Sequence, residues 1–376
     1  MSTGSETGSG EAIGVVYLAR CAEGATAFRR FADSYRRQPA GRDHQLVVIY
    51  KGFVQRRDRL EARAVFNDLP HLAIELDDSG FDIGAYLEAS RRVTHDYLCF
   101  LNTYSELAGS GWLAKLADHG LRDGVGIAGA MGSYESLFDS ILLMRHARWA
   151  RDYALGAADS ERVGFYYGTL LDRANGGDDG IAPRLPPAAG RILRSPWYRW
   201  KALARLWPGA QTIDIRQFPS FPNPHLRSNG FIIRREWLRR FDRIRIGAKS
   251  DANRFESGRH GLTAALRRQG LAAIVVGRDG RGYDVPDWPA SRTFRLGEQE
   301  NLLLSDNQSR NFAALPAGAR ATYRRMSWGD YLGPAPHDFP DLGFAFGAKR
   351  RLGRGCVPGM SAGVAPEGSS PAVKGG

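Results

Sequence analysis

Short apolar runs alternate with amphipathic segments along the first third of the chain. Aliphatic and β-branched residues predict strands at residues 13–18, 46–50, 72–76, 97–101 and 125–130. Between them, apolar residues recur at spacings of three and four, which predicts helices around 28–35, 59–66, 83–92 and 112–117. Strands that alternate with helices are typical of right-handed βαβ crossovers. We therefore predict an α/β fold with a mostly parallel sheet flanked by helices.

The pattern changes after residue 135. A helical stretch rich in Arg and Tyr extends to about 175, and an irregular stretch with many prolines follows to about 224. A regular pattern returns with strands at 231–233 and 273–276, a helix from Glu236, and a helix at 258–269 that Gly270 closes. The predicted organisation is a domain over 12–312 with an insertion at 136–224, an extension at 313–341, and disordered tails at 1–11 and 342–376.

The composition is that of a globular protein, with 43% hydrophobic and 11% aromatic residues. No apolar run approaches the roughly 20 residues that span a bilayer. The first ten residues lack a basic region and an apolar region, so they are interpreted as a flexible tail rather than a signal peptide. Three widely spaced cysteines indicate reduced thiols. The expected location is the cytoplasm.

A net charge of +12 favours anionic partners: nucleotide phosphates, an anionic lipid surface, an acidic glycan or nucleic acid. An arginine-rich surface without a specific partner is the alternative. Residues 181–212 contain no acidic residue, and arginines there are interleaved with Trp197, Trp200 and other aromatic residues. This segment fits glycan stacking, docking on anionic lipid, or a solvated flap. Arginine beside aromatic residues also suits single-stranded nucleic acid, but no nucleic-acid-binding motif is present, so none is expected as a partner.

Polar residues follow the strand at 97–101 directly, and the first of them are Asn102, Thr103 and Tyr104. Ligands of parallel α/β sheets bind at the carboxyl ends of the strands. Residues 77–84 follow the preceding strand and hold Asp77, Asp78 and Asp82. The alternatives are an ordinary loop at 102–106, and a helix start at which Asp82 caps the first turn.

Three segments resemble bacterial glycosyltransferases of the GT-A type. Residues 78–86 resemble the N-x-G-x-D-x-G-A-[YF] signature of rhamnan-synthesis-type and related enzymes, with Asp78 in place of Asn. Residues 228–235 resemble the strand after the central loop of family-two transferases, and Phe255-Glu256 resembles the segment that supplies their catalytic carboxylate. Together they extend over roughly residues 12–312. The resemblance implies a GT-A-like fold.

The resemblance also implies a function. A hexosyltransferase-like enzyme would move a sugar from a nucleotide-sugar donor to a glycan or lipid-linked acceptor during synthesis of lipopolysaccharide, O-antigen or capsule. Such enzymes often lie on the inner membrane, so peripheral contact with its anionic surface is expected. The alternatives are a non-catalytic relative that binds nucleotide or glycan, and a polyanion-binding protein.

Glycosyl transfer needs a held diphosphate, and a base that deprotonates the acceptor hydroxyl. Candidate donor-binding residues are Asp77, Asp78, Gly80, Asp82, Gly84, Asn102, Tyr104, Arg254 and Arg259. At the strand end where the family has Asp-x-Asp, the chain has Asn102-Thr103-Tyr104, which offers no carboxylate for Mg²⁺ or Mn²⁺. Glu106 is a weak metal candidate. A site that holds diphosphate with Arg, Lys and hydroxyl groups is therefore favoured.

Glu256 is the candidate general base, and Asp251 is the second. The alternative for both is an acidic residue at a helix N-terminus, where the dipole favours it. Candidate acceptor-binding residues are Ser133, Tyr134, Arg227, Asn229, Trp197 and Trp200. For Ser133, capping of the following helix is an equal alternative. The resemblance further implies that the polar residues at 297–302 and 306–308 fold back over the donor site.

Overall fold

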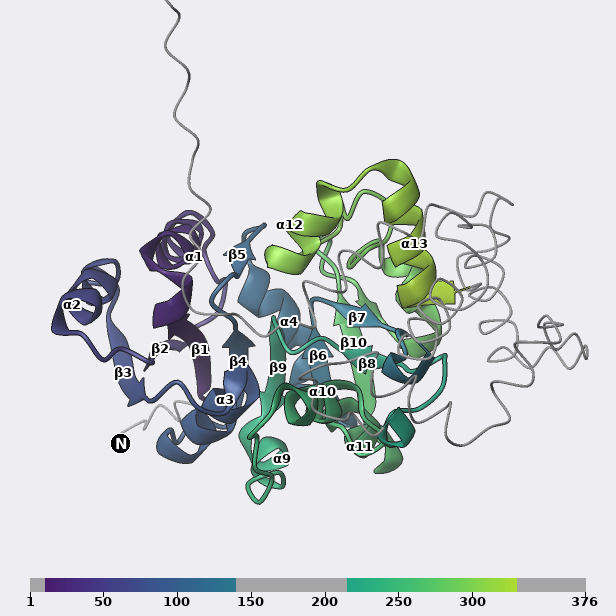
Figure 1. Ribbon diagram of the computed structural model, residues 1–376, viewed down its shortest axis with the longest axis horizontal. Coiled ribbons are helices and arrows are strands. Elements are labelled where there is room, and N and C mark those ends of the chain that lie inside the picture. Colours follow the sequence, from purple (N-terminus) through teal and green to yellow (C-terminus); the bar gives the residue numbers. More distant parts are fainter. Residues whose placement is uncertain (1–10, 140–214, 330–376) are drawn as a thin grey trace, which may run out of the picture.

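The computed structural model describes residues 11–139 and 215–329 (Figure 1). The predicted tails, apart from residue 11, lie outside these ranges, as does the part of the insertion that contains Trp197 and Trp200. The main sheet contains eight strands in the order β11-β10-β6-β9-β4-β1-β2-β3. Their bounds are β1 Ile13–Arg20, β2 Gln45–Lys51, β3 His71–Leu76, β4 Tyr97–Leu101, β6 Val125–Gly129, β9 Phe231–Arg234, β10 Ala272–Val276 and β11 Gly282–Tyr283.

Two small antiparallel pairs lie beside the main sheet. β5 (Glu106–Leu107) pairs with β12 (Leu304–Ser305), and β7 (Gly132–Ser133) pairs with β8 (His225–Leu226). The helices are α1 Ala25–Arg37, α2 Arg56–Ala64, α3 Phe81–Arg92, α4 Trp112–Gly120, α9 Arg235–Arg239, α10 Lys249–Ser257, α11 Leu262–Arg268, α12 Asn307–Ala313 and α13 Ala317–Trp328, with short 3₁₀ turns η1 Cys21–Glu23, η2 Ile215–Gln217 and η3 Val285–Ser291. None of the helices described here is long and apolar enough to cross a membrane.

Strand direction places the segments that carry the candidate site residues at one edge of the sheet. β1 is parallel to β2 and β4, β2 is parallel to β3, and β6 is parallel to β10. β9 lies between β4 and β6 and is antiparallel to both. The carboxyl ends of the parallel strands therefore meet the amino end of β9 at the same edge. The predicted α/β class with a mostly parallel sheet is confirmed.

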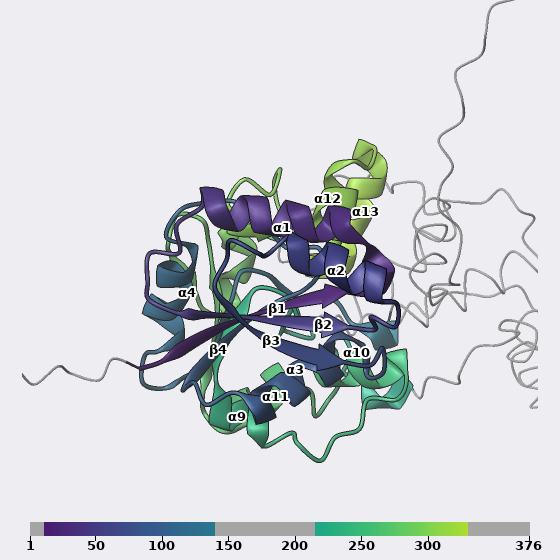
Figure 2. The ribbon, with the colours of Figure 1, turned by 90° about the vertical axis from the view of Figure 1, so that its left-hand side faces the viewer.

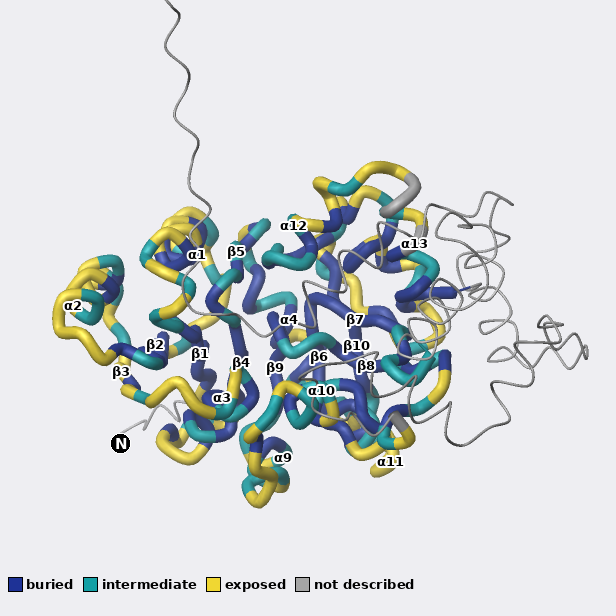
Figure 3. The backbone as a smooth tube through the Cα atoms, in the orientation of Figure 1, coloured by how far each residue is buried: buried dark blue, intermediate teal, exposed yellow. Residues whose placement is uncertain are grey.

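The sheet is covered on both faces (Figure 2). Along β1, Val15 and Tyr17 join the cluster under α1, α2 and α4, while Val16 and Leu18 join the cluster under α3, α10 and α11. This alternation is the period of two that a strand imposes on its side chains. The strands β1, β2 and β4 are buried, whereas the edge strand β3 and the outer helix surfaces are partly exposed (Figure 3).

The end of β4 is fastened to β1 by hydrogen bonds. The Tyr17 hydroxyl donates to the Thr103 carbonyl at 2.9 Å, and the Thr103 hydroxyl donates to the Leu18 carbonyl at 2.7 Å. The Tyr17 ring stacks on Phe31 of α1 at 3.7 Å between centroids. These contacts fix the direction in which the chain leaves β4. Thr103 is thereby buried and turned away from any ligand.

One helical prediction needs correction. The helix predicted at 258–269 begins only at Leu262, and a separate helix, α10, precedes it. α10 ends before Gly258, where a Cβ would lie 2.4 Å from the Arg254 carbonyl oxygen. Gly270 has φ +79 and follows α11, as predicted for a glycine that closes a helix. Packing also continues past residue 312, because Trp328 at the end of α13 is fully buried.

Candidate active site at the carboxyl edge of the sheet

A cluster of charges joins the ends of β1, β2 and β3. The Arg20 guanidinium donates from Nε and Nη2 to the two carboxylate oxygens of Asp78, at 2.7 Å each. Lys51 Nζ donates to Asp78 Oδ1 at 2.8 Å, although the Lys51 side chain is only 1% exposed. Hydrogen bonding from Arg20 lowers the pKa of Asp78 to about 2, and Lys51 adds to this. Asp78 is thus ionised and holds two cations.

The cluster continues to the end of β4 through Glu23. Arg20 Nη1 donates to Glu23 Oε1 at 3.1 Å, and the Tyr104 hydroxyl donates to the other Glu23 oxygen. Burial raises the pKa of Glu23, while Arg20 opposes the rise. The ends of β1, β3 and β4 therefore share one hydrogen-bonded network, and two predicted donor-binding residues, Asp78 and Tyr104, belong to it.

Asp82 lies in the first turn of α3 and is half-buried. The N-cap residue of α3 is Gly80, which has no side chain, and Asp82 is the acidic residue of the first turn. Within residues 11–139 and 215–329, no hydrogen bond or ion pair is found for its carboxylate. Burial raises the pKa of Asp82, the positive charges of Lys249, Lys51 and Arg20 lower it, and Glu256 raises it further. This carboxylate retains unused hydrogen-bonding capacity.

The glycines before and within α3 differ in what the fold requires of them. Gly80 has φ +77, and a Cβ there would lie 3.1 Å from the Gly84 Cα. The Gly84 amide donates to the Gly80 carbonyl at 2.7 Å. At Gly84 itself a Cβ would meet only Ile246 Cβ, at the ordinary distance of 3.9 Å. Packing within the chain explains Gly80 but does not explain Gly84.

Asp77 and Asn102 are occupied by local turns. Asp77 Oδ1 accepts from the Ser79 amide at 3.1 Å and from the Ser79 hydroxyl, which lowers the pKa of Asp77. Asn102 Oδ1 accepts from the Tyr104 amide at 2.9 Å. In both cases a side-chain oxygen closes a turn two residues on, which is a common use of Asp and Asn. The Asp77 carboxylate nevertheless stays exposed to solvent.

The Asn229 side chain, which precedes β9, forms hydrogen bonds with the residues that follow β4. Its Oδ1 accepts from the Asn102 amide at 2.8 Å and from the Ser105 hydroxyl at 2.7 Å. Its side-chain amide donates to Asp306 at 3.4 Å. Asn229 is 3% exposed and supports the strand end from within the core, and its role as an acceptor contact stays a prediction.

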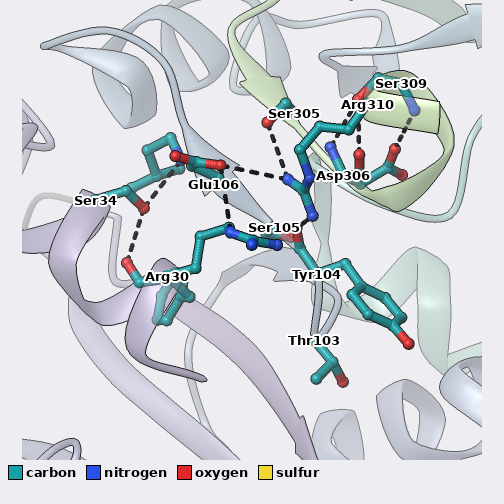
Figure 4. A network of polar contacts seen from close by, with 12 residues as sticks. Arg30, Ser34, Thr103, Tyr104, Ser105, Glu106, Ser305, Asp306, Ser309 and Arg310 are labelled. Carbon is teal, nitrogen blue, oxygen red and sulfur yellow. Dashed lines mark hydrogen bonds and ion pairs between the residues drawn. The ribbon is translucent and has the colours of Figure 1, made fainter. Parts of the chain in front are cut away.

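Glu106, the weak metal candidate, lies between two arginines (Figure 4). Arg30 Nε is 3.8 Å and Arg310 Nη1 is 3.4 Å from Glu106 Oε2. A divalent cation needs several oxygen ligands free to turn toward it. Asn102 and Thr103 are committed to backbone groups, and no cluster of His, Cys, Asp and Glu suited to a metal occurs in the part of the chain that the structure describes. The residues at this strand end do not fit a divalent metal.

Glu256 lies in the last turn of α10, not at a helix N-terminus. Its Oε2 accepts from the Ser228 amide at 2.8 Å and from the Ser228 hydroxyl, and its Oε1 faces Arg227 Nη1 at 2.8 Å. Burial acts to raise the pKa of Glu256, but Arg227, His225 and Ser228 together lower it. Glu256 is therefore ionised, and both of its oxygens are engaged.

Asp251 has the alternative role considered for it, that of an acidic residue at a helix N-terminus. Its Oδ2 accepts from the Gly247 and Ala248 amides at 2.9 and 2.8 Å, and its Oδ1 pairs with Arg254. Arg254 and Arg259 bind η2, through the Gln217 side chain at 2.7 Å and the Arg216 carbonyl at 2.8 Å respectively. These three residues hold α10 and η2 together, and the structure places none of them against the Arg20–Asp78–Lys51 cluster.

Two predicted acceptor contacts are buried. Ser133 is 0% exposed and accepts from the Glu135 amide at 3.0 Å. The Tyr134 ring is 5.1 Å from that of Trp328 and 6.0 Å from that of Trp288, between centroids. Both side chains form part of the packing under α13, and their acceptor-binding role stays a prediction. Arg227 does lie at the sheet edge, where it donates to Gln308 of α12 at 3.0 Å.

Four cationic site residues were not identified from the sequence: Arg20, Lys51, Arg30 and Arg310. The sequence carries a signal for the first two, since each ends an apolar strand with a charge. For Arg30 and Arg310 there is no such signal, because α1 and α12 are more than 250 residues apart and only folding brings them to Glu106.

Comparisons with known proteins found distant structural matches. No protein-family model matches the chain, and no curated protein matches it. Among solved structures, S. aureus TarS matches with 12% identity and a TM-score of 0.25, over 31% of this chain and 21% of that one. A TarS structure of residues 1–349 in complex with UDP-GlcNAc matches with 13% identity and a TM-score of 0.25, over 31% of this chain and 33% of that one.

Glucosyl-3-phosphoglycerate synthase from Mycobacterium tuberculosis, in complex with Mn²⁺, UDP and phosphoglyceric acid, matches with 17% identity and a TM-score of 0.27. The match covers 45% of this chain and 66% of that one. The chain thus spans less than two thirds of each of these structures, and TM-scores this low carry no argument about activity. The sheet itself defines the class, an α/β protein with a mostly parallel sheet flanked by helices.

Proposed function

We propose that this protein is a glycosyltransferase that moves a sugar from a nucleotide-sugar donor to a glycan or lipid-linked acceptor. One observation carries the proposal. The Arg20–Asp78–Lys51 cluster lies at the carboxyl edge of the sheet together with Asp82, a half-buried carboxylate with free oxygens. This edge is where parallel α/β sheets bind nucleotides and related ligands.

The charges at this edge suit the chemistry. A departing nucleoside diphosphate gains negative charge, which fixed cations stabilise without rearrangement. Arg20, Lys51 and Lys249 all act on Asp82 electrostatically, so positive charge surrounds the place where Asp82 would contact a sugar hydroxyl. The buried Lys51 side chain is held against Asp78, so its position at this edge does not depend on a ligand.

Glu256 is proposed as the general base that accepts the proton of the acceptor hydroxyl. Arg227 and Ser228 keep it ionised and fix its orientation. A base with a lowered pKa has a weaker affinity for the proton, and efficient catalysis favours a pKa near the working pH. A loosening of the Arg227 contact on substrate binding would raise the basicity of Glu256.

The biological context is part of the proposal and rests on the sequence resemblance and the charge of the chain. We propose that the acceptor belongs to cell-surface polysaccharide synthesis, such as lipopolysaccharide, O-antigen or capsule. The enzyme would then work in the cytoplasm, at the inner face of the membrane. The basic-aromatic segment with Trp197 and Trp200 would contact the acceptor or anionic lipid.

A binding and activity panel tests the proposal. UDP-, GDP-, dTDP- and CMP-sugars are added separately, and the melting temperature and the release of nucleotide are measured for each. At least one sugar nucleotide is expected to raise the melting temperature and to be hydrolysed or transferred. If none of the common sugar nucleotides binds, the proposal fails.

The engagement of both Glu256 oxygens favours a second candidate, a relative that binds nucleotide sugar or glycan without catalysis. In that case a sugar nucleotide raises the melting temperature while no turnover is detected with any acceptor. The effect of Glu256→Gln distinguishes the two candidates. In an enzyme the substitution abolishes turnover, whereas a binding protein shows no turnover in either form.

A further inference from the structure

Two arginines from distant parts of the chain share one carboxylate at the end of β4. Arg30 comes from α1 and Arg310 from α12, and Glu106 of β5 lies between their guanidinium groups (Figure 4). Arg310 also donates to the Tyr104 carbonyl and to the Ser305 hydroxyl, at 3.1 Å each. Arg310 is thus tied to the strand end, whereas Arg30 has Glu106 as its single partner within the described ranges.

The pairing is loose and accessible. The two nitrogen–oxygen distances, 3.8 and 3.4 Å, are longer than those of a strong charge-assisted hydrogen bond. The side chains of Arg30, Glu106 and Arg310 are 41%, 34% and 29% exposed. Burial lowers the pKa of Arg310, and so does the like charge of Arg30. A second anion would relieve this repulsion.

Other negative charge near Arg310 is already used. Asp306 Oδ1 accepts from the Ser309 amide at 2.9 Å at the start of α12, and Asp306 Oδ2 accepts from Asn229. Among the described residues, Glu106 is therefore the carboxylate that faces both arginines directly. One carboxylate between two guanidinium groups leaves an excess of positive charge that can reach a ligand from solvent.

The arginine pair is continuous with the cluster at the ends of β1 to β3. Arg310 binds the Tyr104 carbonyl, the Tyr104 hydroxyl binds Glu23, and Glu23 binds Arg20 beside Asp78. This chain of contacts links the Asp78 cluster to Arg310 at the end of β4. This is the strand end at which no divalent metal fits.

We propose, building on the proposed glycosyltransferase function, that Arg30 and Arg310 bind the donor diphosphate without a divalent metal and that Glu106 is an internal counter-ion which the diphosphate displaces. Guanidinium groups suit this task, because their planar donors match phosphate oxygens. Glu106 holds the arginines in place in the free protein and competes with the ligand. Replacement of Glu106 and of Arg30 must then have opposite effects on affinity.

The test uses the full chain and UDP, GDP, dTDP, CDP and inorganic pyrophosphate as probes. Calorimetry measures their affinities with excess EDTA and, separately, with Mn²⁺. The nucleoside diphosphate that binds is expected to bind equally well in both. Arg30→Gln is expected to lower the affinity for this diphosphate about fivefold, and Glu106→Gln to raise it about fivefold. Effects of this size are typical of a partly exposed ion pair. Affinity for the corresponding nucleoside should not change.

Arg29→Gln is the matched control, since Arg29 lies on the same helix and pairs with Glu61 at 3.1 Å, toward α2. Its affinities should equal those of the wild type. Arg310→Lys, which keeps the charge, is expected to lower the affinity for the diphosphate less than Arg310→Gln does. Melting temperatures identify any variant that fails to fold, and Arg30→Gln with its single loose contact should fold normally.

Several results would overturn the inference. If diphosphate binding requires Mn²⁺ and Glu106→Gln weakens it, then Glu106 is a metal ligand, and the glycosyltransferase proposal survives while the arginine assignment fails. If diphosphate binds without metal but neither Arg30→Gln nor Glu106→Gln changes its affinity, the cations lie elsewhere. If neither a nucleoside diphosphate nor a sugar nucleotide binds under any condition, the proposed function itself fails.

Discussion

Arg20 at the end of β1 binds both carboxylate oxygens of Asp78, which follows β3, at 2.7 Å each. The fully buried Lys51 shares the same carboxylate. Two cations with one principal counter-ion form a cluster that is held in position before any ligand arrives. The cluster joins three neighbouring strand ends, so its integrity bears on both stability and binding.

Asp78→Asn should destabilise the protein. The substitution leaves the buried Lys51 ammonium and the Arg20 guanidinium without their shared negative charge. We expect a loss of about 1–2 kcal/mol in the free energy of unfolding. The loss is smaller than for a fully buried ion pair because the Asp78 side chain is 44% exposed. Urea denaturation measures it. The neighbouring Asp77→Asn is the control, since within the described residues Asp77 bonds Ser79 and no cation. An equal loss there would contradict the prediction.

The contribution of Asp78 to stability should depend on pH. Its pKa in the folded protein is about 2, below the ordinary value of 3.8. A lowered pKa means that the stabilisation is present above about pH 4 and is lost as the pH falls toward about 2. The difference in stability between the wild type and Asp78→Asn should therefore be constant near neutral pH and shrink in acid. A difference that is independent of pH down to the folded-state pKa would show that the charge of Asp78 is not responsible.

Glu256→Gln and Asp251→Ala should separate a catalytic carboxylate from a structural one. Loss of a general base lowers turnover by about a hundredfold or more, so Glu256→Gln should retain donor affinity and lose turnover. Asp251→Ala removes the acceptor for two backbone amides at the start of α10 and should cost about 1 kcal/mol of stability with turnover preserved. Steady-state kinetics and thermal denaturation measure the two effects. If turnover falls in Asp251→Ala alone, the assignment is reversed.

Asp82→Asn should stabilise the protein and impair its use of the donor. Burial raises the pKa of Asp82, which means that the ionised carboxylate is unfavourable in the folded state at neutral pH. An uncharged amide removes this cost, so the melting temperature should rise. The KM for the sugar nucleotide should rise as well, while affinity for the nucleoside diphosphate stays the same. A residue with a purely structural role would show the opposite effect on stability.

Gly84→Ala tests whether the donor approaches α3 closely. Alanine has room at this position, and in a helix it is more favourable than glycine by about 0.5–1 kcal/mol. The variant should therefore melt at a higher temperature and bind the sugar nucleotide more weakly. Gly80→Ala provides the comparison, since its positive φ makes alanine unfavourable by about 1–2 kcal/mol. Unchanged donor affinity in Gly84→Ala would restrict the role of Gly84 to packing.

The predicted strands agree with the observed ones because each is a short apolar run bounded by polar residues. The run at 97–101 coincides with β4, and that at 13–18 lies within β1. Predictions that depend on helix boundaries are less accurate, as the helix predicted at 258–269 shows. α10 was not predicted, so Glu256 was considered for a helix N-terminus, whereas it lies in the last helical turn.

The structure places the candidate site residues in two kinds of position. Asp78, Asp82, Tyr104, Arg227 and Glu256 do lie at the carboxyl edge. Ser133, Tyr134 and Asn229 are polar residues of the same kind in similar positions, yet they are buried and bonded within the core. Polar residues beside a strand are satisfied either by a ligand or by other parts of the chain, and their spacing does not distinguish these two cases.

The sequence by itself determined the alternation of strands and helices, and with it the parallel sheet and the edge at which a site would form, because hydrophobic periodicity is a local property. It also showed that the strand end at 102–104 lacks carboxylates. Only the tertiary structure decided which charges meet there. The pairing of Arg20 with Asp78, and of Arg30 and Arg310 with Glu106, joins segments far apart in the chain, and such contacts depend on packing that no local pattern encodes.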